Sequence, residues 1–161
     1  MTKILANTMT FETRPFSMRE PLLSVMLDNQ PSVYQPGDPL RGEYQIDAVD
    51  PADIRAVELS VLWFTEGKGD EDLSVHYFER LTADDTQPAL HELRRFQTVL
   101  PNSPLSYEGV LVRIRWCVRV RVFLRQGRDF VAERDFQLGE VPMARTVAET
   151  AAPTASQAVG P

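Results

Sequence analysis

The sequence has a single cysteine, Cys117, and only two histidines, His76 and His91, in 161 residues. One cysteine excludes a framework of intrachain disulfides and favours a reducing compartment. The two histidines stand alone, without the spacing of metal-ligand motifs, and a catalytic Cys–His pair would require distant side chains to converge in space. We therefore predict a protein without catalytic residues, cofactor or metal, in which Cys117→Ser preserves function.

Positive net charge and long apolar runs are also missing. Acidic residues outnumber basic ones by 23 to 17, and the formal net charge of -6 argues against nucleic acid as a ligand. No stretch approaches the roughly 20 apolar residues of a membrane-spanning helix. The N-terminal residues also lack the apolar stretch of a signal peptide. We expect a cytoplasmic protein with no integral membrane segment, for which peripheral contact with a membrane stays open.

Helical periodicity is absent as well, and the sequence shows alternation instead. From Gly109 to Arg125, apolar and basic residues alternate with a period of two, which is typical of a strand with one buried and one solvated face. The buried face is expected to carry Val110, Val112, Ile114, Trp116, Val118, Val120, Val122 and Leu124, and the other face Arg113, Arg115, Arg119, Arg121 and Arg125 with Leu111, Cys117 and Phe123. Such a strand predicts an antiparallel sheet packed on a second layer.

Strand-like runs bounded by turn residues fill residues 21–140. They are Leu22–Asp28, Leu40–Ala48, Ile54–Thr65, Leu73–Arg80, His91–Leu100, Gly109–Arg125 and Phe130–Leu138. This spacing predicts one all-β domain, an immunoglobulin-like β-sandwich of about seven antiparallel strands. In the fourth run Leu73, Val75 and Tyr77 are expected to face inward. Residues 1–20 are expected to form an extended arm and residues 141–161, with few large apolar groups, a disordered tail.

The last two runs suggest a hairpin, because Gln126-Gly127-Arg128 reads as a three-residue turn with glycine in the left-handed conformation. That turn would place Trp116 opposite Leu138 and Val122 opposite Ala132 on the apolar face. On the other face it would place Arg125 opposite Asp129, Arg121 opposite Glu133 and Arg119 opposite Asp135. The arginine face is therefore expected to be paired with acidic residues across the ladder.

Two charged segments are the candidate interaction surfaces. The first is the arginine face of the long strand, Arg113, Arg115, Arg119 and Arg121, which could bind acidic peptides or anionic lipid headgroups or could simply be a solvated, neutralised face. The second is Asp70, Glu71 and Asp72, within a segment that matches neither a phosphate-binding loop nor an EF-hand. We expect these three residues to form a flexible hairpin tip that can contact a basic partner.

Two further segments narrow the sandwich to a family. Tyr34-Gln35-Pro36-Gly37-Asp38-Pro39-Leu40-Arg41-Gly42 contains a Pro-Gly pair typical of a type II turn and ends in a glycine within a strand. Later, Leu100-Pro101 is followed by Ser106-Tyr107-Glu108-Gly109 and then by the long strand. The order and spacing of these blocks resemble the arrestin family, from about Leu22 to Leu138. The resemblance implies an adaptor fold without catalytic residues, usually present as two domains in tandem, whereas one is visible here.

The resemblance and the composition together lead to an expected function. We expect a non-enzymatic, arrestin-like protein-interaction module, an adaptor or scaffold, that binds a protein partner through an exposed sheet edge or through the loops at one end. A single domain also favours a homodimer, or pairing with another arrestin-like domain. The alternatives are a structural subunit of a larger assembly and weak binding of anionic lipid by the arginine face.

Overall fold

The structure is a computed structural model, and it describes residues 20–82, 90 and 92–139. The described strands are β1 (Leu22–Leu27), β2 (Val33–Tyr34), β3 (Pro39–Asp47), β4 (Ile54–Gly67), β5 (Leu73–Thr82), β6 (Arg94–Val99), β7 (Tyr107–Glu108), β8 (Val112–Leu124) and β9 (Asp129–Leu138). A three-residue 3-10 helix, η1 (Pro51–Asp53), precedes β4. The expected N-terminal arm and C-terminal tail lie almost entirely outside the described residues, as does His91.

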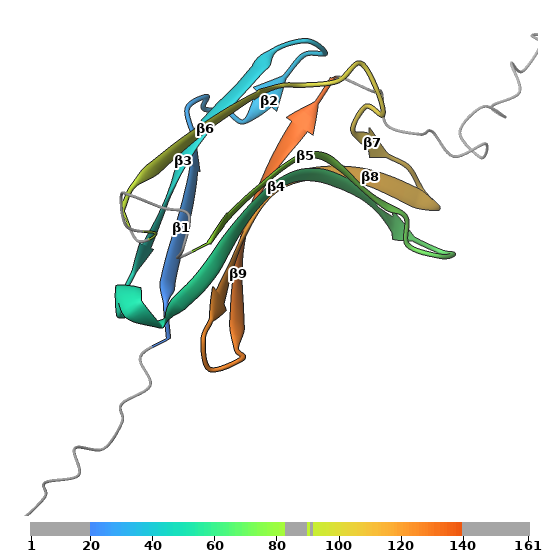
Figure 1. Cartoon of the computed structure of the whole chain (residues 1–161). Coiled ribbons are helices and arrows are strands. Elements are labelled where there is room, and N and C mark those ends of the chain that lie inside the picture. Colours follow the sequence, from blue (N-terminus) through green and yellow to red (C-terminus); the bar gives the residue numbers. More distant parts are fainter. Residues whose placement is uncertain (1–19, 83–89, 91, 140–161) are drawn as a thin grey trace, which may run out of the picture.

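The strands form two sheets that pack face to face (Figure 1). The smaller sheet has the order β1-β3-β6, and the larger one has the order β2-β9-β8-β4-β5, with β7 also paired to β8. Neighbouring strands are antiparallel except for the short parallel pair of β2 and β9. The predicted β-sandwich is confirmed, although the short strands β2 and β7 were not foreseen. Within the described residues, no helix is long and apolar enough to cross a membrane.

The core lies between the two sheets and follows the alternation of the long strands. From Trp116 to Leu124, the even-numbered residues of β8 are buried, with exposed fractions of 8% or less. They meet alternate residues of β4, from Val57 to Val61, and the buried side chains of β3. The Trp116 indole N–H donates to the Pro104 carbonyl at 2.9 Å, and its ring contacts the ring of Phe136. A period of two thus places one full row of apolar side chains in the core.

The β8–β9 hairpin differs from the predicted register by two residues. Trp116 lies opposite Phe136 rather than Leu138, and Val122 lies opposite Phe130 rather than Ala132. The turn is 125–127, one residue earlier than expected, because Leu124 N–H donates to the Arg128 carbonyl at 2.8 Å and Gly127 takes the left-handed conformation at the third turn position. A shift of two residues keeps every side chain on its predicted face, so hydrophobic alternation could not distinguish the two registers.

A β-bulge changes the direction of the side chains at the start of β5. Val61 of β4 lies opposite Tyr77 while Leu62 lies opposite Val75, so β5 contains one extra residue, His76. The prediction that Leu73 and Val75 face inward with Tyr77 is therefore wrong. Leu73 and Val75 are exposed on the outer face, while Tyr77 packs against the core. An inserted residue reverses alternation on one side of the bulge, and the sequence pattern carried no sign of it.

The two segments that carry the family resemblance contact each other through their backbones. Gln35–Asp38 forms the expected type II turn, with Gly37 at a φ of 85° and Asp38 N–H donating to the Gln35 carbonyl at 3.0 Å. Gly37 N–H also donates to the Leu100 carbonyl at 3.1 Å, which joins the Pro-Gly turn to the Leu-Pro segment. Gly37 and Leu100 therefore act here through their backbone groups.

Candidate interaction surface at one end of the sandwich

Two hairpin tips meet at the end of the larger sheet. The first, between β4 and β5, is 67–72, and the second, between β7 and β8, is 109–112. Lys68 N–H donates to the Leu111 carbonyl at 3.1 Å, and Gly67 lies opposite Val112 in the ladder. A Cβ at Gly67 would collide with the Leu111 carbonyl. We call the combined surface of these two tips the hairpin end.

The hairpin end exposes consecutive aliphatic side chains. Val110, Leu111 and Val112 have exposed fractions of 67%, 65% and 38%, and Leu73, at the start of β5, has 47%. Val110 and Val112 were expected on the buried face, but the smaller sheet does not cover them. An exposed run of three apolar residues is unusual for a surface loop and is typical of a contact site. The signal in the sequence was the break in alternation at Leu111, which has apolar neighbours on both sides.

The acidic residues singled out in the sequence lie on the same end. Asp70, Glu71 and Asp72 are all exposed in the tip between β4 and β5. The tip is closed by two hydrogen bonds, from Thr65 N–H to the Asp72 carbonyl at 2.9 Å and from Asp72 N–H to Thr65 Oγ1 at 2.8 Å. The structure therefore places the acidic candidates beside exposed aliphatic side chains, a combination that suits a basic and apolar contact.

The arginine candidates lie on the outer face of β8, away from the smaller sheet. Each of them forms an ion pair: Arg113 with Glu108 at 2.6 Å, Arg115 with Glu66 at 2.9 Å, Arg119 with Glu133 at 2.6 Å and Arg121 with Asp129 at 2.6 Å. The acids come from β4, β7 and β9, and the partners of Arg119 and Arg121 differ from those expected because of the shifted register. The pairs neutralise the face, which reduces its attraction for a polyanion.

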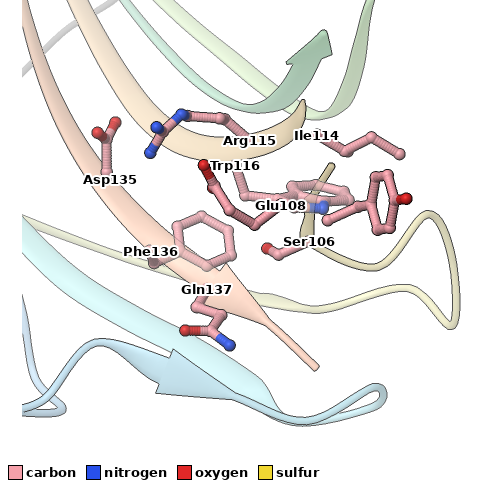
Figure 2. Close-up of a pocket in the computed structure, with 9 residues that line it drawn as sticks. Ser106, Glu108, Ile114, Arg115, Trp116, Asp135, Phe136 and Gln137 are labelled. Atoms are coloured by element: carbon pink, nitrogen blue, oxygen red, sulfur yellow. The ribbon is translucent and has the colours of Figure 1, made fainter. Parts of the chain in front are cut away.

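A surface cleft of about 350 Å³ lies beside the hairpin end, alongside β8 between β7 and β9 (Figure 2). It is lined by Ser106, Tyr107, Glu108, Ile114, Arg115, Trp116, Asp135, Phe136 and Gln137. β7 pairs with β8 at Arg113 and Ile114, and β9 begins to pair at Trp116, so the cleft opens where one strand replaces the other. Sequence reasoning missed this site because it depends on the position of β7.

The charged groups of the cleft gather at one side, where Figure 2 shows Glu108, Arg115 and Asp135. The hydrogen bond from Arg115 Nε to Glu66 raises the pKa of the arginine, and the negative charges of Glu66, Glu108 and Asp135 act in the same direction. Asp135 lies opposite Cys117 and has no ion-pair partner among the described residues. One carboxylate at the cleft is therefore free to contact a ligand.

Cys117 and His76 lie on opposite faces of the larger sheet. Cys117 is fully buried on the arginine side of β8, beside Leu62 of β4. His76 points to the core side, where its Nε2 lies 2.8 Å from the Val99 carbonyl and its ring contacts that of Trp116. The two side chains cannot act as a catalytic pair in this arrangement. Among the described residues, no group of three or more His, Cys, Asp and Glu side chains could hold a metal ion.

Native Cys117 is expected to resist alkylation by iodoacetamide at mildly alkaline pH. Burial raises the pKa of its thiol from 9.0 to about 12, so the reactive thiolate is scarce and access is closed. Because the folded pKa is the higher one, this group's contribution to stability is complete below pH 9.0 and decreases as the pH rises toward 12. The resistance to alkylation is tested by mass spectrometry of protein treated with iodoacetamide in the presence and absence of guanidinium. Rapid labelling of the folded protein would contradict it.

Two packed sheets, the Pro-Gly turn docked on the Leu-Pro segment and the long alternating strand define an arrestin-like β-sandwich. Among solved structures, the sporulation control protein Spo0M from Bacillus subtilis is similar to this chain, with a TM-score of 0.54 and 15% sequence identity over 75% of this chain and 50% of that one. The chain thus spans about half the length of that protein. No protein-family model and no curated protein sequence matches it. The likeness establishes the fold.

Proposed function

We propose that this chain is a non-enzymatic protein-interaction module that binds a protein partner through the hairpin end, in a reducing cytoplasmic compartment. The observation that carries the proposal is the exposed run Val110, Leu111 and Val112, held by backbone hydrogen bonding against the acidic tip. Burial of apolar area by a partner supplies affinity, while Asp70 and Glu71 select for positive charge. A partner segment with both aliphatic and basic side chains fits this surface best.

The other surfaces considered fit less well. β5 is an edge strand of the larger sheet, but the bulge at His76 interrupts the regular backbone that a partner strand would need. Anionic lipid is not favoured by the arginine face, because all four candidate arginines are paired with acidic residues. The loops at one end are therefore preferred over the β5 edge as the binding surface.

Leu111→Asp is expected to weaken the complex with the partner by at least about tenfold, which corresponds to roughly 1.4 kcal/mol. An aspartate there removes apolar area that the partner would bury. Burial of its carboxylate at the contact also costs desolvation free energy. The matched control is Met26→Asp, because Met26 is exposed to a similar degree, 60% against 65%, on the outer face of the smaller sheet. Both changes lie on the surface and are expected to preserve the fold.

The partner is first identified with a photo-crosslinking amino acid placed at Leu111 or, in parallel, at Met26, in the organism that expresses the chain. A protein that is crosslinked from position 111 and not from position 26 is then purified. Its affinity for the unmodified chain, for Leu111→Asp and for Met26→Asp is measured by calorimetry. If the crosslinked protein is a second copy of this chain, the complex is a homodimer. Equal affinities of the Leu111→Asp and Met26→Asp chains would refute binding at the hairpin end.

A further inference from the structure

The cleft of Figure 2 adjoins the aliphatic run of the hairpin end. Glu108 lines the cleft, and the next residues along the chain, from Gly109 to Leu111, form the exposed tip. Leu111 is three positions along the chain from both Glu108 and Ile114, so an extended partner segment that contacts Leu111 can reach the cleft within about three residues. The volume of about 350 Å³ falls within the range of roughly 300–1,000 Å³ typical of small-ligand pockets and accommodates a long side chain.

The charges around the cleft favour a cation. The negative charges of Glu66, Glu108 and Asp135 all act on the Arg115 guanidinium, and Glu108 also pairs with Arg113. Both arginines are already engaged, at 2.6 Å with Glu108 and at 2.9 Å with Glu66. The group has a net charge of minus one (two positive against three negative), and Asp135 is the carboxylate left without an ion pair among the described residues.

The hydrogen-bonding groups of the cleft also favour a cationic ligand. The Trp116 indole N–H donates to the Pro104 carbonyl, and the Gln137 side-chain N–H donates to the Gly139 carbonyl at 3.0 Å. Ser106 Oγ accepts from Leu138 N–H at 2.8 Å. The indole and amide donors are thus used within the protein, whereas Ser106 Oγ, the Asp135 carboxylate and the Gln137 side-chain oxygen are acceptors. A ligand with N–H donors complements these acceptors.

We infer that the cleft receives the lysine or arginine side chain of a partner segment whose aliphatic residues contact Val110 and Leu111. The inference rests on the proposed function and defines its partner more narrowly, as an extended segment in which basic and aliphatic residues alternate. The charged head lies against Asp135 and the methylene stem lies along the apolar wall formed by Ile114 and Phe136.

The test is an NMR titration of the isotopically labelled full chain with two synthetic peptides. The first is acetyl-Val-Lys-Leu-Lys-Val amide, and the second is the same peptide with both lysine side chains acetylated, which keeps the stem and removes the charge. We expect the first peptide to shift the amide signals of Ser106 and Gln137 and the Trp116 indole signal. The acetylated peptide should bind at least about tenfold more weakly, as expected for loss of a charge-assisted hydrogen bond.

Two variants assign the effect to the cleft. Asp135→Asn keeps the shape of an exposed side chain and should weaken binding of the lysine peptide about tenfold, whereas Asp47→Asn, an exposed carboxylate on β3, should leave the affinity unchanged. Equal affinity for the two peptides, no effect of Asp135→Asn, or no signal shift at the cleft would each overturn the inference. Shifts confined to Val110 and Leu111 would overturn the cleft assignment alone, while failure of the Leu111→Asp test would refute the proposed function itself.

Discussion

Replacing Trp116 by alanine is expected to lower the free energy of unfolding by about 3–5 kcal/mol. The indole has an exposed fraction of 1% and is packed in the core beside the cleft, where its ring contacts those of His76 and Phe136. Truncation removes this apolar burial and leaves a cavity that the surrounding strands can fill only in part. It also leaves the Pro104 carbonyl without the indole N–H that donates to it.

Two comparisons separate these contributions. Trp116→Phe keeps much of the apolar volume and loses the hydrogen bond, so its expected cost is smaller, about 1–3 kcal/mol. Trp63→Ala removes the same kind of side chain from a half-buried position on β4 and should cost less than Trp116→Ala. Chemical denaturation followed by circular dichroism measures all three variants. A cost below about 1 kcal/mol for Trp116→Ala would contradict the described core.

Gly42→Val is expected to destabilise the fold by about 3 kcal/mol through overpacking. Gly42 lies in the middle of β3, the central strand of the smaller sheet, opposite Leu27 and Phe96. A Cβ at this position would collide with the Met26 carbonyl and come within 2.7 Å of the Phe96 ring. The carbonyl belongs to the neighbouring strand and cannot move without disturbing the ladder between β1 and β3.

The origin of this cost can be tested by a double-mutant cycle. Gly42→Ala should destabilise less than Gly42→Val, since it adds one carbon, and Phe96→Leu should reduce the cost of Gly42→Ala by relieving one of the two collisions. The adjacent Arg41→Ala, which changes an exposed side chain on the same strand, is the control and should cost within about 0.5 kcal/mol. Additive costs of Gly42→Ala and Phe96→Leu would show that the ring does not limit the space at Gly42.

The backbone roles of Gly42 and Gly37 explain why the arrestin-like blocks could be recognised in the sequence although they did not point to the cleft, which is lined in part by Ser106, Tyr107 and Glu108 of the second block. Gly42 permits close approach of two strands, Gly37 permits the Pro-Gly turn, and the Leu100 backbone joins that turn to the second block. These requirements concern backbone geometry, so they produce recognisable residue patterns wherever the fold occurs. The residues of the proposed interaction surface have no such backbone constraint and leave no comparable pattern.

Predictions about the arginine face were right in kind and wrong in detail. Alternation predicted that Arg119 and Arg121 share the outer face and that acids lie across the ladder, and both arginines are paired with acids of β9. The partners are Glu133 and Asp129 instead of Asp135 and Glu133, because the turn begins one residue earlier. That difference leaves Asp135 without an ion pair in the described part of the chain, beside the cleft.

The sequence by itself determined the all-β class, the buried row of β8 and the turn at Gly37, because each depends on contacts between residues that are near one another or repeat with a period of two. Only the tertiary structure decided the bulge at His76, the exposure of Val110 and Val112 and the cleft beside Asp135. These features depend on where one strand ends against another and on how far the smaller sheet reaches. Both are set by long-range packing, to which the local alternation of residues is insensitive.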